Sequence, residues 1–313
     1  MKVIEIEHPH HFNSDDFPPL VVALGFFDGV HKGHQKVIHT AVDTAKNKGI
    51  SSAVMTFDPH PSAVLGSDVQ HVRYITPIQD KTAYIAELDV DYLFIIHFTE
   101  EFASLHPQEF VDDYLIKLNV RHIVAGFDYT YGRYGKGTMK TLPFHSEGRF
   151  TQTVVEKQTL EDEKVSSTRI RKILENGDFI EFHRLSGRFY TTRGIVIHGE
   201  KRGRQLGFPT ANIQVSDNYL FPSTGVYAVR ISIQDKWYDG VCNVGYKPTF
   251  HEKRPEYPSV EVHILSFNGE IYDEEVEIEW HKRLRSEKKF NGIEELIKQI
   301  NADKTDAQAY FGG

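Results

Sequence analysis

Cysteine is nearly absent from the sequence, because Cys242 is the only one in 313 residues. A single thiol cannot form an internal disulfide, which fits a reducing compartment, and we expect a cytoplasmic protein. Long apolar runs are also missing. No stretch approaches the roughly 20 residues that span a bilayer, and the first residues lack the apolar core of a signal peptide. We therefore expect no membrane partner.

An excess of positive charge is missing as well. The 36 lysines and arginines are outnumbered by 44 aspartates and glutamates, which gives a formal net charge of -8. A chain of this charge has no overall attraction to nucleic acid, and none is expected as a partner. Internal repeats and low-complexity tracts are absent too. The length, however, suffices for two domains with separate cores.

The first half of the chain alternates between strand and helix patterns. Short β-branched or aromatic runs are each followed by an amphipathic segment. This alternation predicts an α/β domain whose sheet is mostly parallel and covered by helices. The expected strands cover residues 20–24, 51–57, 91–98 and 121–127, and the expected helices cover residues 34–48, 78–88, 107–118, 166–177 and 178–187, the last two with glycine at or just beyond their ends.

The pattern changes near Gly187, after which strand-like runs follow one another with little helix between them. Such a series predicts a small antiparallel β-barrel, and residues 291–311 then read as a C-terminal helix. Asn268–Gly269 is a typical hairpin signal. We expect domains at residues 1–185 and 186–313. The expected barrel strands cover residues 189–199, 225–234, 236–245, 259–267 and 274–284.

The stretch GFFDGVHKGH, residues 25–34, joins the first expected strand to the first helix. Ligands bind at this kind of place in open α/β sheets, and a helix N-terminus favours phosphate. His31 and His34 are three apart and can face the same side. A zinc site is an alternative, although no third ligand stands nearby, and a turn whose histidines only cap or pack is another. The candidate nucleotide-binding residues here are Gly25, Phe26, Phe27, Asp28 and Gly33.

A second stretch, SSTRIR, opens a helix near the end of the first domain. Hydroxyl groups, free N–H groups and a guanidinium suit a pyrophosphate, although three such residues alone are compatible with a simple N-cap. With GFFDGVHKGH, this stretch resembles the signatures of the H-x-G-H nucleotidyltransferase superfamily. That resemblance implies that His31, His34 and Arg171 are catalytic and that Ser166, Ser167 and Thr168 bind the nucleotide.

Two intervening segments narrow the resemblance. TFDPHP (residues 56–61) and GFDYTYGRYGKGT (residues 126–138) are similar to parts of the FMN adenylyltransferase module of bacterial FAD synthetases. Without that similarity they read as a proline-fixed turn and a surface loop. The resemblance places the flavin at Asp58, Pro59 and Asp128. The flanking segment RYITPIQDK (residues 73–81) departs from the family's more usual form, which contains Leu-Thr, and this departure affects none of the expected catalytic residues.

The second domain carries HGEKRGRQLGFPTANI, residues 198–213. This is not a Walker A motif, yet its glycines and basic residues could cradle phosphates. Thr210 and Asn212 share one face of an extended segment, and their oxygens suit Mg²⁺. An ordinary polar hairpin loop is equally compatible with this spacing. Gly203 and Gly207 are the candidate nucleotide-binding glycines.

The second domain resembles riboflavin kinase throughout, in GRQLGFPTANI, GVYAV, NVGYKPTF, VEVHIL and LRSEKKF. The resemblance implies that Thr210 and Asn212 bind the metal of the nucleotide and that Glu261 is the general base. From alternation alone, Glu261 and His263 face away from Val262 and Ile264, as solvent-facing residues of a strand also would.

Together the two halves resemble the bifunctional riboflavin kinase/FMN adenylyltransferase family of bacteria. The resemblance implies two reactions: riboflavin and ATP give FMN, and FMN and a second ATP give FAD and pyrophosphate. ATP, riboflavin, FMN and FAD are then substrates or products, and Mg²⁺ is the cofactor. Two alternatives remain: a different H-x-G-H nucleotidyltransferase, and a flavin-sensing protein without turnover. The sequence leaves the oligomeric state open.

Overall fold

The computed structural model describes residues 1–66, 72–157, 159–160, 163–199, 203, 206–216, 218–246 and 258–312. The chain divides into two compact units, Met1–Ser167 and Thr168–Gly313. Each unit is built around its own core, and the two are described in turn.

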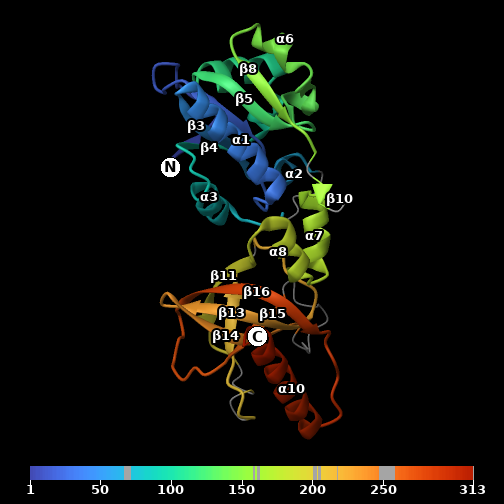
Figure 1. The fold of residues 1–313 in the computed structure, drawn as a ribbon. Helices are drawn as coiled ribbons and strands as arrows, with labels where there is room; N and C mark the ends of the chain where they lie inside the picture. The colour runs from blue at the N-terminus through green and yellow to red at the C-terminus, as the bar shows by residue number, and fades with distance from the viewer. Residues whose placement is uncertain are drawn as a thin grey trace. The chain divides into compact units, whose positions relative to one another are not determined.

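A six-stranded sheet forms the centre of the first unit (Figure 1). All neighbouring strands are parallel, which confirms the expected α/β fold. The strand order places β2, with all five residues buried, near the middle of the sheet. The order is β1 (Lys2–Ile6), β4 (Tyr92–His97), β3 (Ser51–Asp58), β2 (Leu20–Leu24), β5 (Val120–Gly126) and β8 (Thr151–Val155).

Helices cover both faces of this sheet. Successive residues of β2 alternate between two apolar clusters, with Leu20 and Val22 in one and Val21 and Ala23 in the other. This is the arrangement expected of a parallel strand buried on both sides. One face carries α1 (Lys32–Lys48) and α3 (Ile78–Ala86), and the other carries α4 (Glu100–Ser104), α5 (Pro107–Phe110) and the π-helix η1 (Val111–Ile116).

The helix expected at residues 107–118 is confirmed over residues 107–116, although only its first turn is an α-helix. It begins as α5 and continues as η1, whose hydrogen bonds are spaced one residue wider. Several short elements were not expected at all. These are the edge strands β1 and β8, the helices α2 (Pro61–Leu65) and α6 (Leu142–Ser146), the 3-10 turn η2 (Arg133–Gly135), and the strand pairs β6 (Thr130–Tyr131) with β7 (Gly137–Thr138) and β9 (Thr159–Leu160) with β10 (Glu163–Lys164).

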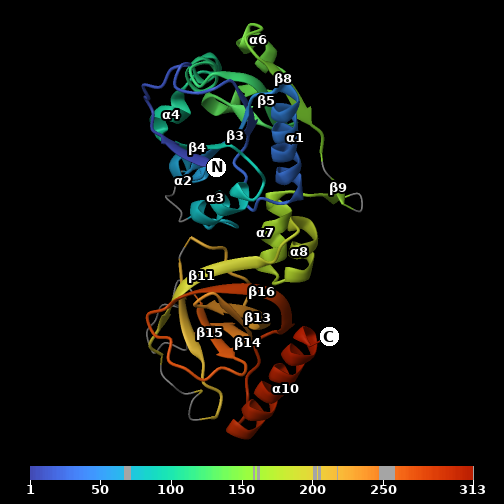
Figure 2. The same cartoon turned by 60° about the vertical axis from the view of Figure 1, so that its left-hand side comes forward.

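A closed six-stranded barrel forms the second unit (Figure 2). Every neighbouring pair is antiparallel, which confirms the expected barrel. The C-terminal helix α10 (Ile293–Phe311) packs against its wall, as expected. The barrel order is β11 (Tyr190–Ile197), β12 (Ala211–Val215), β15 (Ser259–Ile264), β14 (Lys236–Gly245), β13 (Gly225–Ile233) and β16 (Glu275–Arg285).

Two helices precede the barrel, α7 (Ser167–Glu175) and α8 (Phe179–Ser186). The sequence places both correctly, and Gly187 ends α8 in the left-handed conformation that glycine favours. The hairpin expected at Asn268–Gly269 is wrong, because β15 and β16 are not neighbours in the barrel. The tight hairpin instead joins β13 to β14 through Gln234 and Asp235.

Candidate active sites

The first candidate site begins where β2 ends. The loop of residues 25–31 connects Leu24 to α1, and Phe27, Gly29 and Val30 all have positive φ (56°, 91° and 37°). Two hydrogen bonds hold this strained loop against Thr76. The Thr76 N–H donates to the Asp28 carboxylate over 3.0 Å, and the Gly29 N–H donates to the Thr76 hydroxyl over 2.8 Å. Asp28 is buried, so its carboxylate stabilises the loop from beneath.

His31 and His34 lie together at the start of α1. Their rings stack with centroids 3.6 Å apart, so the two side chains do face the same side, as the spacing predicts. The Nδ1 of His31 caps the helix by accepting the His34 N–H over 3.2 Å. Burial, aided by the neighbouring His31 and Lys81, lowers the pKa of His34 well below its ordinary value. The His34 imidazole is therefore neutral near pH 7.

The zinc alternative gains no support in this region. The part of the chain that the structure describes contains no group of three histidine, cysteine, aspartate or glutamate side chains that could hold a metal ion.

The second nucleotide motif approaches the same loop. Ser167 donates a hydrogen bond from its hydroxyl to the Asp28 carbonyl over 3.0 Å, across 139 residues of sequence. The Val165 carbonyl lies 3.6 Å from the place where a side chain at Gly33 would begin, so glycine keeps this approach open. Ser166 is half-buried beside them. Thr168 and Arg171 lie further along α7, in the second compact unit.

Lys81, which the sequence did not single out, lies beneath the same loop. Its side chain is 1% exposed although it belongs to α3. The ammonium donates to the Phe26 carbonyl over 2.9 Å and lies 4.0 Å from the centre of the Phe26 ring. Lysine is almost never buried without a partner. The burial of Lys81 marks it as a residue of interest. Composition and helix periodicity could not predict this burial.

An aromatic cavity of about 460 Å³ lies in the same unit. Tyr129 contributes a buried hydroxyl that has no hydrogen-bond partner among the described residues. Burial raises the pKa of this phenol, so it stays protonated and can donate. The remaining aromatic lining residues are Phe57, Phe98, Phe102, Phe110, Tyr131 and Tyr134.

The three expected flavin residues do not line this cavity. Asp58 ends β3, directly after the lining residue Phe57, and burial raises the pKa of its carboxyl while Lys81 lowers it. Pro59 follows it, and Asp128 is an exposed residue next to the lining residue Tyr129. The cavity wall thus consists of sequence neighbours of the expected flavin residues.

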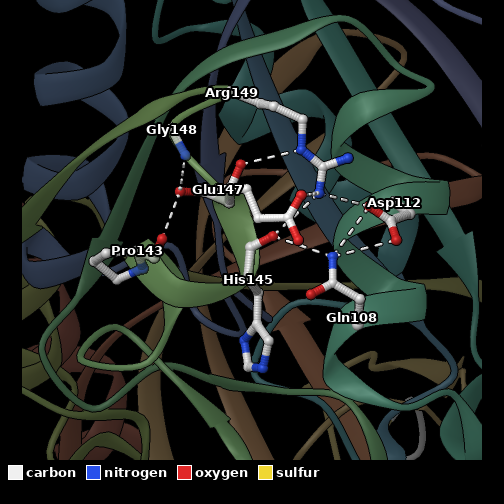
Figure 3. A network of polar contacts seen from close by, with 8 residues as sticks. Gln108, Asp112, Pro143, His145, Glu147, Gly148 and Arg149 are labelled. Carbon is white, nitrogen blue, oxygen red and sulfur yellow. Dashed lines mark hydrogen bonds and ion pairs between the residues drawn. The ribbon is translucent and has the colours of Figure 1, made fainter.

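A polar network supports one wall of the cavity (Figure 3). Gln108 donates to the Asp112 carboxylate and to the His145 carbonyl, and Arg149 forms a 2.8 Å ion pair with Asp112. The His145 ring points away from these contacts, and its Nδ1 lies 2.8 Å from the Tyr131 hydroxyl. The network therefore fixes α6 and, through His145, the Tyr131 ring that lines the cavity.

The second candidate site lies on the barrel. Asn212, Glu261 and Asn243 are direct cross-strand partners on β12, β15 and β14. Directly paired residues point to the same face, so the carboxylate stands between two amides. Val260, Val262 and Ile264 are buried while Glu261 and His263 are not, which confirms the expected alternation. Asn243 is a further polar residue of this row that the sequence did not single out.

The expected metal and phosphate segment leads into this row. Thr210 immediately precedes β12, and the His263 ring lies 2.8 Å from the Pro209 carbonyl, which fixes the segment to β15. The Gly203 carbonyl accepts the N–H groups of Leu206 and Phe208, which forms a tight turn. Gly207 has a φ of 84° and is exposed. Lys201, Arg202 and Arg204 lie outside the described residues.

A cavity of about 380 Å³ adjoins the row. Thr210, Asn243 and Glu261 line one side, and residues of α10 and of the segment before it line the other. Arg285 lines it too and forms a two-pronged ion pair with the buried Asp303 of α10, with both N–O distances at 2.8 Å. This pair holds the helix against the barrel strand that bears Arg285.

Comparisons with known proteins match the two halves of the chain separately. A model of the FAD synthetase family matches residues 14–169, and a model of the riboflavin kinase family matches residues 186–311. The chain is 55% identical to the bifunctional riboflavin kinase/FMN adenylyltransferase of Bacillus subtilis, over 99% of this chain and 98% of that protein. It is 49% identical to the protein of the same name from Listeria monocytogenes, again over 99% and 98%.

A solved structure shares the whole fold. It is described as a macrolide-efflux protein from Streptococcus pneumoniae, and its sequence is 34% identical to this chain. The superposition covers 98% of this chain and 99% of that protein, with a TM-score of 0.89. Among the residues described for the present chain, no helix has the length and apolar character needed to cross a membrane. Both family models and the full-length relatives point the same way, and the chain belongs to the bifunctional riboflavin kinase/FMN adenylyltransferase family.

Proposed function

We propose that this chain phosphorylates riboflavin to FMN in its C-terminal domain and adenylylates FMN to FAD in its N-terminal domain. Residues 186–313 carry the first reaction and residues 1–185 the second. The observation that carries the proposal is the presence of two separate candidate sites, the histidine pair in one unit and the Asn–Glu–Asn row in the other, with a cavity in each unit. A protein with one of these activities needs only one such site.

In the adenylylation reaction, an FMN phosphate oxygen attacks the α-phosphorus of ATP and pyrophosphate leaves. The nucleophile belongs to the substrate, so the protein has to align the reactants and stabilise developing negative charge. His31 and His34 at the N-terminus of α1 are suited to the phosphates, and Ser166, Ser167, Thr168 and Arg171 are assigned to the leaving pyrophosphate. Gly25, Phe26, Phe27, Asp28 and Gly33 shape the nucleotide loop.

The flavin of this reaction is assigned to the aromatic cavity of the first unit. A flat apolar ring fits walls made of aromatic side chains, and the free Tyr129 hydroxyl can serve a polar edge of the ring. Asp58, Pro59 and Asp128 are assigned to the rim of that cavity. This assignment extends the expected flavin residues to their neighbours on β3 and after β5.

In the kinase reaction, the ribityl hydroxyl of riboflavin attacks the γ-phosphorus of ATP. Glu261 is assigned as the proton acceptor, and it lines the cavity of the barrel in one row with Asn212 and Asn243. Thr210 and Asn212 offer the hydroxyl and amide oxygens that Mg²⁺ prefers, so these residues would hold it, with Gly203 and Gly207 near the phosphates. Mg²⁺ would neutralise phosphate charge during the transfer.

The cellular compartment and the partners of the enzyme are part of the same proposal. The single cysteine is buried, and the chain carries no excess of positive charge, so we assign the enzyme to the cytoplasm without a nucleic-acid or membrane partner.

Chromatography of flavins tests the proposal directly. The pure protein is incubated with riboflavin, ATP and Mg²⁺, and separately with FMN, ATP and Mg²⁺. We expect FAD from both mixtures and transient FMN in the first. A flavin-binding protein without turnover would leave both mixtures unchanged, and FAD from the second mixture alone would refute the kinase assignment.

A further inference from the structure

Lys81 is a buried cation without a paired anion. It lies on α3 with 1% of its surface exposed, and no carboxylate in the described part of the chain comes within ion-pair distance of its ammonium. Its hydrogen bonds go to the Phe26 carbonyl over 2.9 Å and to the Thr56 hydroxyl over 3.4 Å. Burial of a charge without a paired anion costs free energy. This cost indicates that the charge of Lys81 has a function.

Support of the loop of residues 25–31 does not require a charged side chain at position 81. The Phe26 carbonyl already accepts a 2.8 Å hydrogen bond from the Thr56 hydroxyl, so it is satisfied without Lys81. A neutral side chain of similar length would fill the same space without the desolvation cost. The Phe26 ring, 4.0 Å from the ammonium, offsets only a part of that cost.

The field of Lys81 reaches the histidine pair. The charge of Lys81 is one of the causes that lower the pKa of His34 at the start of α1. Burial lowers the pKa of Lys81 itself to about 8, although Asp28 and Asp58 attract its proton. The Coulomb interaction of such a charge with its neighbours is stronger in a low-dielectric site than in water. Any polyanion bound at this helix terminus would therefore be attracted by it.

We propose that Lys81 is a positioning residue of the adenylyl-transfer site, whose buried ammonium supplies the positive field that orients the nucleotide phosphates from beneath the loop of residues 25–31. The inference rests on the proposed function, because it assigns ATP to this loop. Lys81 acts through the loop and through its field, whereas His31 and His34 face the phosphates.

Replacement of the charge is the first test. Lys81→Met keeps the length of the side chain, and Lys46→Met, at an exposed lysine of α1, is the matched control. We expect the kcat/KM for ATP in FMN adenylylation to fall about 100-fold or more in Lys81→Met, with riboflavin phosphorylation by the same protein unchanged. The melting temperature should stay the same or rise, since a buried charge is removed. An unchanged adenylylation rate, or a loss fully explained by a lower melting temperature, would overturn the role.

The pH profile of the wild-type enzyme is the second test and requires no variant. The charged and titratable groups that interact with Lys81 are Asp28 on the loop, Asp58 on β3 and His34 on α1, and the ordinary pKa values of these types lie below 7. We expect kcat/KM for adenylylation to decline above about pH 8, and kcat to decline only at higher pH, because bound phosphates favour the ammonium.

A third variant assigns that decline to Lys81. In Lys81→Arg the cation stays protonated at high pH, so the decline should disappear and the rate should stay above that of Lys81→Met. A wild-type profile that is flat from pH 7 to 10, or a decline retained in Lys81→Arg, would refute the inference. A wild-type protein that makes no FAD from FMN would instead refute the proposed function, so the two failures can be told apart.

Discussion

At the scale of single residues, the environment decides which protonation state each candidate group can reach. His34 is surrounded by other cationic or buried groups, and burial is the largest cause of its lowered pKa. Glu261 is instead the cross-strand partner of two neutral amide residues, Asn212 and Asn243. The two candidate sites thus differ in character: one holds a buried imidazole with a lowered pKa, and the other a carboxylate in a row with two amides.

The lowered pKa of His34 makes the first unit sensitive to acid. The unfolded chain binds the proton at the ordinary value of 6.5, whereas the folded chain binds it only at lower pH. The unfolded state therefore carries more protons below about pH 6.5, and the free energy of unfolding falls as pH decreases through this value. Above about pH 6.5, His34 is neutral in both states, and the free energy of unfolding keeps its full value.

Thermal unfolding between pH 8 and 5 measures this effect. We expect the melting temperature of wild type to drop on acidification, and His34→Gln to flatten the drop. His39→Gln, at an exposed histidine on the same helix, should leave the profile as in wild type. Identical profiles for wild type and His34→Gln would contradict the burial of a neutral His34.

Glu261 gives the corresponding prediction for the barrel. Glu261→Gln keeps the shape and removes the proton acceptor, so riboflavin phosphorylation should slow by about 10² to 10⁴. FMN adenylylation should be unchanged. Glu275→Gln, at an exposed glutamate of β16, is the control and should leave both rates intact. Normal kinase turnover in Glu261→Gln, measured by flavin chromatography, would rule out the assigned role.

At the scale of elements, turn geometry decides where the barrel strands reverse. Gln234 and Asp235 are the two loop residues between the paired Ile233 and Lys236, and both have positive φ (48° and 62°). This is the type I′ geometry that normally selects Asn-Gly. The two-residue hairpin between β13 and β14 therefore lacks the usual sequence signal, while the favourable Asn268–Gly269 pair lies in a connection between strands that do not pair.

A designed turn should stabilise the barrel. Replacement of Gln234 by Asn and Asp235 by Gly removes the strain of positive φ, which is worth about 0.5–1 kcal/mol. The melting temperature of the barrel transition should rise by a few degrees. Asp235→Val is the opposite control, because a β-branched residue is disfavoured at φ 62°, and it should lower the transition. A lower melting temperature in the Asn-Gly variant would contradict the assigned turn.

The elements also show what sequence patterns can predict. Apolar periodicity gave α1 with its five buried residues, Val37, Ile38, Ala41, Val42 and Ala45, because a helix against a sheet repeats every turn. It missed β1 and β8, because edge strands need little apolar surface. It also missed Lys81, because no local pattern reports that a lysine on a helix lies beneath a loop 55 residues earlier. Such contacts depend on the tertiary fold.

At the scale of the whole molecule, two reactions are linked by one intermediate. Each compact unit has its own core and its own candidate site, so each reaction can be damaged without the other. FMN is the product of one site and the substrate of the other. The chemistry itself requires no covalent transfer between the sites, because FMN is a stable molecule that can leave and bind again.

Complementation between two inactive variants tests this organisation. His31→Ala should lose about 10²–10³ in adenylylation while it keeps the kinase, and Glu261→Gln should do the reverse. Neither variant alone should convert riboflavin to FAD at an appreciable rate. An equimolar mixture should do so, because FMN made by one molecule reaches the other through solution. The rate should rise with total protein concentration, since the transfer is between molecules. A mixture that makes FMN but no FAD, although the Glu261→Gln protein adenylylates added FMN, would mean that the intermediate is not released and that the two sites of one chain work only on their own FMN.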